Sequence, residues 1–81
     1  MTASLHTTRY RFLRDSLAEA RKSQGLSQDA LAEKLGRLQT FVSKYERGER
    51  RLDVVELLDV AEALGLDAAK LIRQLMAMDG E

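Results

Sequence analysis

Glycine divides this chain into segments, and the composition of those segments is helical. The glycines are Gly25, Gly36, Gly48, Gly65 and Gly80, and proline is absent. Leu, Ala, Glu, Arg, Lys and Gln dominate the stretches between them, and these residues have high helix propensity. Glycine is the usual residue just past a helix end because, without a Cβ, it enters the left-handed region freely. The pattern therefore predicts an all-α chain in which each glycine ends a helix.

Each predicted helix has a start signal and lies before a glycine. The five helices are expected over residues 9–24, 27–35, 38–47, 53–64 and 67–78. The clearest start is the capping box formed by Asp53 and Glu56. Residues 1–8 are expected to be a flexible N-terminal arm and residues 79–81 a tail. Residues 9–78 are therefore predicted to form one five-helix domain.

The composition excludes several classes of function. The chain has 81 residues, 44% of them hydrophobic and 32% charged, which fits one small globular domain. It has no cysteine and only one histidine, His6, so disulfides, thiolate sites and histidine-cluster metal sites are excluded. No apolar stretch reaches the roughly 20 residues of a membrane span, and no signal-peptide pattern occurs. Because no nucleophile–base pair or phosphate loop is present either, we expect a cytoplasmic protein with no enzymatic activity, no cofactor and no membrane partner.

Charge is unevenly distributed, although the formal net charge is zero. Residues 34–51 carry a net charge of +4, whereas residues 1–33 carry +1 and residues 52–81 carry −5. The basic side is therefore concentrated on the third predicted helix and the loop after it. Such a domain can present one face to phosphates, and an ordinary solvated surface is the alternative.

The third predicted helix has an apolar back and a polar front. At about 100° of rotation per residue, the back carries Leu38, Phe41, Val42 and Tyr45. The front carries Gln39, Thr40, Ser43, Lys44 and Arg47. Amides, hydroxyls and cations are the groups that read base edges and phosphates in the major groove of DNA. The preceding helix is short and joined through a tight turn at Gly36, which indicates a helix-turn-helix.

Two consecutive motifs resemble a known family. They are LSQDALAEKLG at residues 26–36 and QTFVSKYERG at residues 39–48. The combination is similar to the phage repressor and Cro-type (XRE-type) helix-turn-helix family, and the similarity covers about residues 9–75. The resemblance implies a lambda repressor-like fold. It also implies a transcriptional regulator that binds a pseudo-palindromic operator in double-stranded DNA as a homodimer.

Carried over by position, the resemblance implies a role for individual residues. Gln39, Thr40 and Lys44 would face base edges, and Gln28 would bond a backbone phosphate and brace the first recognition residue. The remaining predicted DNA-binding residues would contact phosphates or the groove edge, or lie in the turn: Arg37, Ser43, Arg47, Arg50 and Arg51. Arg21 and Glu46 match a family pair that forms a largely buried ion pair between the first and third helices. A surface ion pair is the alternative reading of these two residues.

Three positions leave the DNA contacts implied by the resemblance undecided. Leu38 stands where many members of that family have a capping Ser or Thr, and Arg37 is charged where a small or apolar residue is frequent. Either difference could shift the tip of the recognition helix in the groove. Phe41 could touch a thymine methyl group or pack on the protein's own core.

The last predicted helix carries more apolar residues than one core stripe needs, namely Leu71, Ile72, Leu75, Met76 and Met78. The surplus favours a homodimer through the C-terminal helix, with a frayed helix end as the alternative. A two-fold dimer would place its recognition helices about 34 Å apart, one turn of DNA.

A rival function belongs to a different class, the protein-interaction modules. The chain could be an antitoxin or adaptor whose partner is a protein. The acidic residues Glu56, Asp59 and Glu62 of the fourth predicted helix are read as a solvated face, and a protein contact is the alternative.

Overall fold

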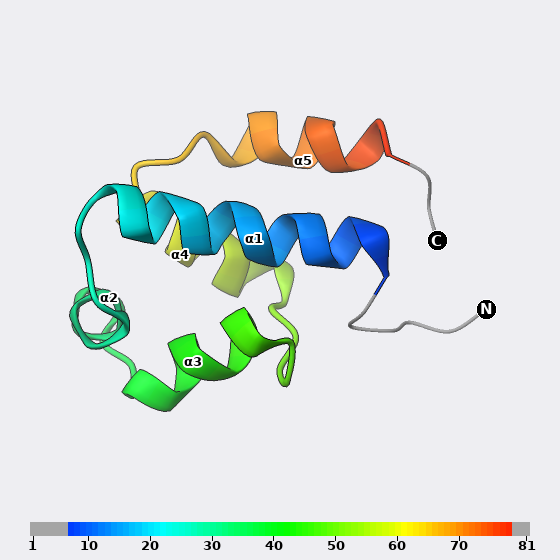
Figure 1. Cartoon of the computed structure of the whole chain (residues 1–81). Helices are drawn as coiled ribbons and strands as arrows, with labels where there is room; N and C mark the ends of the chain where they lie inside the picture. Colours follow the sequence, from blue (N-terminus) through cyan, green and yellow to red (C-terminus); the bar gives the residue numbers. More distant parts are fainter. Residues whose placement is uncertain (1–6, 79–81) are drawn as a thin grey trace.

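The computed structural model describes residues 7–78, and this part of the chain contains five α-helices and no strand (Figure 1). The helices are α1 (Thr8–Ser23), α2 (Gln28–Leu35), α3 (Gln39–Arg47), α4 (Val54–Ala63) and α5 (Ala68–Met76). The predicted all-α architecture of five helices is confirmed. His6, the predicted tail and residues 1–6 of the predicted arm lie outside the described residues.

Four of the five helices begin at a capping side chain. The N-cap residues that accept a hydrogen bond from the backbone N–H three residues along are Thr7, Ser27, Asp53 and Asp67. At α4 the bond is reciprocal, because Glu56 also accepts from the Asp53 backbone N–H. This reciprocal pair is the predicted capping box. The exception is α3, whose N-cap Leu38 has no side-chain acceptor.

Several predicted helix boundaries shift by one or two residues. Thr7 and Thr8 cap and begin α1, so they belong to the domain and not to the predicted arm. Leu38 precedes α3 in an extended conformation (φ −72°, ψ 151°) instead of starting the helix. At the other end of the chain α5 stops at Met76, two residues before the predicted end.

Gly36 and Gly48 end α2 and α3 in the left-handed region, at φ 68° and 77°. Gly48 meets a second requirement, because a Cβ there would lie 2.7 Å from Nη1 of Arg14. The same Nη1 donates to the Glu46 carbonyl oxygen at 3.3 Å. Glycine therefore stops α3 and leaves room for the Arg14 guanidinium beside its last turn.

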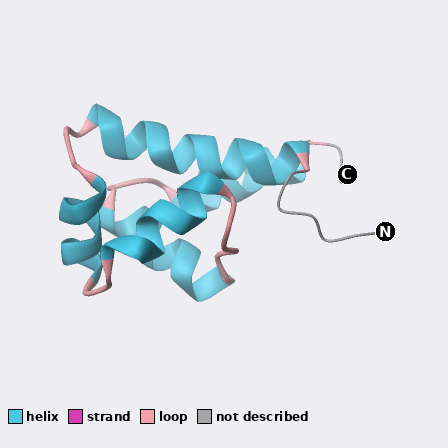
Figure 2. Cartoon of the chain, turned by 60° about the horizontal axis from the view of Figure 1, so that its bottom comes forward, coloured by secondary structure: helices cyan, strands magenta, loops and turns pink. Residues whose placement is uncertain are grey.

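The core joins all five helices. α3 packs on α1 and α2, α4 packs on α2 and α5, and α5 also packs on α1. The largest fully buried side chains are Leu17, Leu31, Val42, Tyr45, Val60 and Leu64. In Figure 1, α3 lies on one side of α1 and α5 lies on the other. Figure 2 turns α3 and the loops at its two ends toward the viewer.

None of the helices in the described residues has the length and apolar character needed to cross a membrane.

Candidate nucleic-acid interface

The front of α3 is polar and exposed, and its back is buried, largely as predicted. Gln39, Thr40, Lys44 and Arg47 are exposed. Phe41, Val42 and Tyr45 are buried in the core. The short helix therefore presents two amide- or hydroxyl-bearing residues in its first turn and two cations further along.

Two residues of this segment do not lie where helical rotation places them. Leu38, predicted on the apolar back, is 78% exposed because it precedes the helix and does not follow the helical rotation. Ser43, predicted on the polar front, is only 5% exposed, and its hydroxyl donates to the Thr40 carbonyl oxygen at 3.3 Å. Rotation alone ignores the elements that pack on the flanks of α3, so it overestimates the width of the exposed front.

A buried ion pair fixes α3 to α1. Arg21 Nε donates to Glu46 Oε2 at 2.7 Å and Nη2 donates to Oε1 at 3.1 Å. The two side chains are 10% and 8% exposed. Arg21 Nη1 also donates to the Leu26 carbonyl oxygen at 2.8 Å. The hydrogen bonds that Arg21 donates to Glu46 raise the pKa of Arg21. The buried pair predicted from the resemblance is confirmed, and the surface alternative is wrong.

A chain of hydrogen bonds leads from this ion pair to the tip of α3. Gln28 Nε2 donates to Glu46 Oε1 at 2.9 Å, and Gln39 Nε2 donates to Gln28 Oε1 at 3.0 Å. A carboxylate can only accept hydrogen bonds, so Glu46 decides which end of the Gln28 amide faces it. The Gln28 oxygen in turn decides the orientation of the Gln39 amide. Gln39 therefore keeps its Oε1 and one N–H available for an external partner, braced by Gln28 as the resemblance implies.

Phe41 belongs to the core. Its ring is 8% exposed and lies edge-to-face with Tyr45, with 5.5 Å between the ring centroids. The guanidinium carbons of Arg37 and Arg50 lie 4.2 and 4.7 Å from the Phe41 centroid, within cation–π range. The core interpretation of Phe41 is confirmed, and in this structure the ring is too buried to meet a thymine methyl group.

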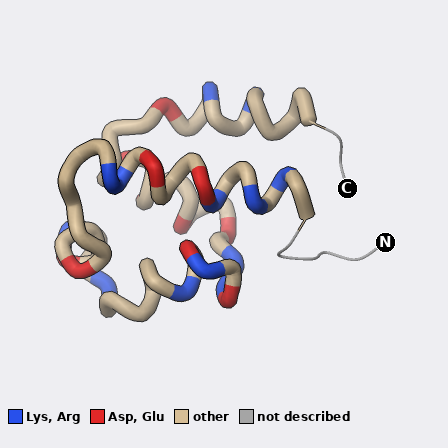
Figure 3. Tube along the Cα trace, viewed as in Figure 1, with Lys and Arg blue, Asp and Glu red and all other residues tan. Residues whose placement is uncertain are grey.

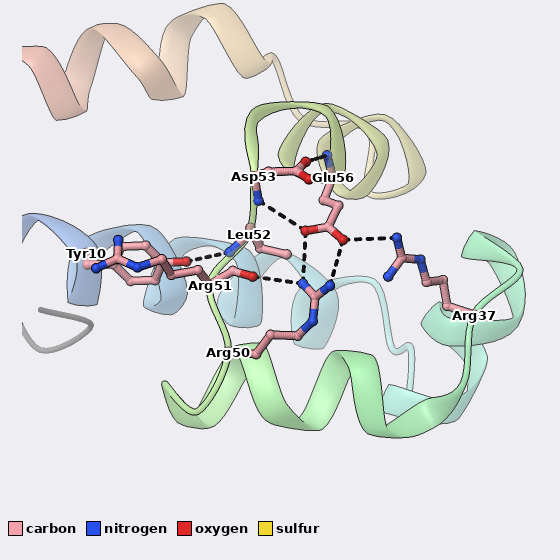
Figure 4. A network of polar contacts seen from close by, with 7 residues as sticks. All are labelled: Tyr10, Arg37, Arg50, Arg51, Leu52, Asp53 and Glu56. Carbon is pink, nitrogen blue, oxygen red and sulfur yellow. Dashed lines mark hydrogen bonds and ion pairs between the residues drawn. The ribbon is translucent and has the colours of Figure 1, made fainter. Parts of the chain in front are cut away.

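Glu56 occupies a position that the sequence does not predict. Glu56 is predicted to lie on a solvated face with Asp59 and Glu62, but only those two are exposed and Glu56 is buried. Its carboxylate accepts from Arg37 Nη2 at 3.0 Å and from Arg50 Nη1 and Nη2 at 2.9 and 2.8 Å (Figure 4). Hydrogen bonds from Arg50 and from the Asp53 backbone lower the pKa of Glu56 to about 2. The capping box signalled one role of Glu56, whereas its arginine partners come from separate loops and left no local signal.

The other predicted cations are more exposed. Arg47 forms two hydrogen bonds of 3.1 Å with Glu49, which raise the pKa of Arg47 and lower the pKa of Glu49. The Arg51 guanidinium carbon lies 5.7 Å from the centroid of the Tyr10 ring. The Tyr10 hydroxyl accepts from the Leu52 backbone N–H at 2.8 Å, which fixes the start of the α4 segment to α1 (Figure 4).

An open groove of about 410 Å³ lies beside α3. Its lining residues are Arg37, Leu38, Thr40, Phe41, Lys44, Glu49 and Arg50. Four of these are among the predicted DNA-binding residues, so the fold brings residues from both ends of α3 to one surface.

The profile of the helix-turn-helix family matches residues 17–71, a range that includes α2, α3 and the turn between them. The chain belongs to the helix-turn-helix family. The XRE-family like protein from Pseudomonas syringae pv. tomato str. DC3000 is similar at 49% identity and a TM-score of 0.83, over 91% of this chain and 90% of that chain. A protein of Sinorhizobium fredii, named "Uncharacterized HTH-type transcriptional regulator y4dJ", is 33% identical over 57 residues, which are 70% of this chain and 74% of that protein.

The same helix-turn-helix fold occurs in the restriction-modification controller protein C.Esp1396I. Its tetramer, in complex with its natural 35 base-pair operator, gives a TM-score of 0.75 at 21% identity, over 88% of this chain and 93% of that chain. At this level of identity the similarity concerns the fold.

Within the helix-turn-helix, α2 is the first helix and α3 is the second, the element that reads bases in such motifs. Figure 3 shows lysine and arginine on α3 and in the loop that follows it, on the opposite side of α1 from α5. No cluster of three or more potential metal-ligating residues occurs within residues 7–78.

Proposed function

We propose that this chain is a transcriptional regulator that binds operator DNA sequence-specifically, with α3 in the major groove. The observation that carries the proposal is the exposed Gln39 amide, held from behind by Gln28 and the buried Arg21–Glu46 pair. A side chain whose donor and acceptor are oriented before DNA arrives suits the reading of base edges. The regulator acts in the cytoplasm and needs no cofactor.

The free groups of Gln39 match adenine. Its Oε1 can accept from the adenine N6 amino group while its remaining N–H donates to N7. Lys44, one α-helical turn beyond Thr40 on the exposed front, suits the acceptors of guanine, and the Thr40 hydroxyl suits either base. These three residues are the proposed base readers.

Phosphate contacts fix the register of α3 on the duplex without reading sequence. The proposed phosphate-binding residues are Gln28, Arg37, Arg47, Arg50 and Arg51. Ser43 is left out of this set because its hydroxyl is buried and bonded to the Thr40 carbonyl. Since bound phosphates release counterions, the logarithm of the affinity should fall with log salt by about 0.9 for each phosphate contacted.

The proposed DNA-bound form is a homodimer that pairs through α5. Leu71 is buried and Ile72 and Leu75 pack on the core, so the apolar surplus expected on this helix centres on Met76, which is 73% exposed. Because α5 lies on the other side of α1 from α3 (Figure 1), pairing there leaves the recognition helix uncovered.

Selection from a randomised pool of DNA duplexes at near-physiological salt tests the proposal. An enriched inverted repeat with half-sites about 10 bp apart is the expected result. An enriched single half-site would retain DNA reading and contradict the dimer. No enrichment from folded protein would contradict the function and favour the protein-interaction module. That rival is supported by one observation, the exposure of Val54, Val55 and Leu58 at the start of α4.

A further inference from the structure

The Glu56 network connects the two loops that flank the recognition helix. Arg37 precedes α3 and Arg50 follows it, yet both side chains donate to Oε2 of Glu56 in the first turn of α4. Figure 4 shows Arg50 reaching the carboxylate from below and Arg37 reaching it from the right. One buried acid therefore holds two arginines from opposite ends of α3.

The shared acceptor brings two like charges unusually close. Because Arg37 Nη2 and Arg50 Nη2 bond to the same oxygen atom, they lie within a few ångströms of each other. One carboxylate neutralises only one of the two cations, so the triad keeps a net positive charge. The Arg37 and Arg50 side chains are 39% and 37% exposed, whereas the Glu56 side chain is 11% exposed. The positive charge therefore faces solvent and the negative charge does not.

The two arginines also keep donors that the protein does not use. Arg37 Nε and Nη1 and Arg50 Nε donate no hydrogen bond to any of the described residues. Both guanidinium groups lie over the Phe41 ring and line the groove beside α3. Both guanidinium groups are thus held against the ring, and their spare N–H groups belong to side chains that line the groove.

We propose that Glu56 is a positioning residue that assembles Arg37 and Arg50 into one preorganised site for a DNA backbone phosphate beside α3. This inference rests on the proposed function, since the phosphate belongs to the operator. Two forked guanidinium groups supply several N–H donors in fixed directions, which suits a tetrahedral phosphate better than two independent flexible chains do. Glu56 does not touch the phosphate in this arrangement, and it acts only through the two arginines.

The sign of one mutational effect separates this role from simple electrostatics. Removing an acid near a DNA-binding surface should strengthen binding, because DNA is a polyanion. Positioning predicts the opposite, because Arg37 and Arg50 would have to be ordered when DNA binds. Glu56→Gln is therefore expected to weaken binding to the selected DNA roughly 5- to 20-fold, although it raises the net charge by one. Gln can still accept the Asp53 backbone bond of the capping box, so the helix start is retained.

Glu49→Gln is the matched control. Glu49 lines the same groove, but its carboxylate bonds exposed Arg47 and neither arginine of the triad. We expect this variant to bind DNA about 2-fold more tightly, as charge alone predicts. Equal strengthening by both glutamine variants, with folded protein by circular dichroism, would overturn the proposal.

A double-mutant cycle tests whether Glu56 acts through the arginines. In the Arg37→Ala/Arg50→Ala background, Glu56→Gln should no longer weaken binding, whereas a general effect on the tilt of α3 would persist there. Arg50→Lys is a second variant that keeps the positive charge. It removes the bidentate contact with Glu56, because lysine has no forked guanidinium group. It should weaken binding about 3- to 10-fold while changing the salt dependence little, because the positive charge is kept. Unchanged affinity in Arg50→Lys would overturn the site even where Glu56→Gln fails to fold.

Binding by the parent protein distinguishes failure of the proposed function from failure of the Glu56 site. Parent protein that enriches no DNA contradicts the proposed function itself. If the parent protein binds its selected duplex but the variants change affinity as charge alone predicts, the proposed function is retained. Only the Glu56 site is then contradicted.

Discussion

Glu46 and Glu49 lie three residues apart at the end of α3 and form ion pairs of different kinds. Glu46 bonds Arg21 with both side chains almost fully buried, whereas Glu49 and Arg47 are about half exposed. A buried charge that loses its partner is costly because nothing else solvates it. An exposed pair gains little because water and salt screen it.

Arg21→Met should lower the free energy of unfolding by about 3–5 kcal/mol, because it leaves the Glu46 carboxylate buried without its counterion. Arg47→Met is the control and should change stability by less than about 1 kcal/mol. Urea unfolding followed by circular dichroism measures both. Similar losses in the two variants would contradict the distinction between the pairs.

The depressed pKa of Glu56 predicts a stability that depends on pH. The folded-state value of about 2 lies below the ordinary 4.5, so the charged carboxylate contributes stability above about pH 4.5 that is lost as the pH falls toward 2. Between pH 5 and pH 2, the free energy of unfolding should fall by about 1–2 kcal/mol more in the parent than in Glu56→Gln. This figure already includes a reduction for solvent screening at the edge of the site. Urea titrations at stepwise pH test this. Parallel pH profiles of the two proteins would show that the network adds no stability.

Base reading should depend on individual residues of the exposed front of α3. Lys44→Ala should cost about 1–3 kcal/mol on the selected duplex and relax the preference at particular base pairs. Lys70→Ala removes a cation that is also exposed, from α5 on the other side of α1, and should have little effect. Fluorescence anisotropy with the selected and single-substituted duplexes gives both values. Equal losses of affinity in the two lysine variants would contradict the binding of DNA at α3.

Whole helices could be predicted from the sequence because their signals are local. Caps, stop glycines and spacing lie within a few residues of one another, and they gave all five helices within one or two residues of their bounds. The prediction for Leu38 is wrong for a local reason, since Leu38 lies one residue before the helix. Ser43 and Glu56 could not be placed, because their burial depends on segments distant along the chain. The Arg21–Glu46 pair is as distant, and only the resemblance to a family predicted it.

Within residues 7–78, α3 is the one helix that starts without a capping side chain, so a cap can be added there. Leu38→Ser should raise the free energy of unfolding by about 0.5–2 kcal/mol, because a hydroxyl at the N-cap can accept from a backbone N–H of the first turn, where the Phe41 N–H has only the Leu38 carbonyl oxygen at 3.0 Å. Ser27→Ala, at the capped start of α2, should lower it by a similar amount. Thermal and urea unfolding measure the change in stability of both variants. No gain from Leu38→Ser would mean that water already serves this helix start.

At the scale of the whole molecule, the separation of α3 from α5 predicts that assembly and DNA reading can be altered independently. Met76→Asp should weaken the dimer by about 1–3 kcal/mol, because it places a charge in the proposed apolar contact. Leu58→Asp, on the exposed face of α4, is the control. Sedimentation equilibrium measures the dimer, and binding to a single half-site checks that α3 is intact. Loss of the dimer in Leu58→Asp alone would move the interface to α4.

The hydrogen-bonded series Arg21–Glu46–Gln28–Gln39 limits how this protein's preference for a DNA sequence can change during evolution or redesign. A new side chain at position 39 meets the oxygen of the Gln28 amide, and the direction of that oxygen is set by the Glu46 carboxylate that accepts from the nitrogen of the same amide. A residue at position 39 that cannot donate a hydrogen bond leaves that oxygen without a donor. A new residue at position 28 must still donate a hydrogen bond to Glu46. New specificities should therefore arise by paired substitutions at positions 28 and 39, and libraries that randomise the recognition helix alone would miss most of them.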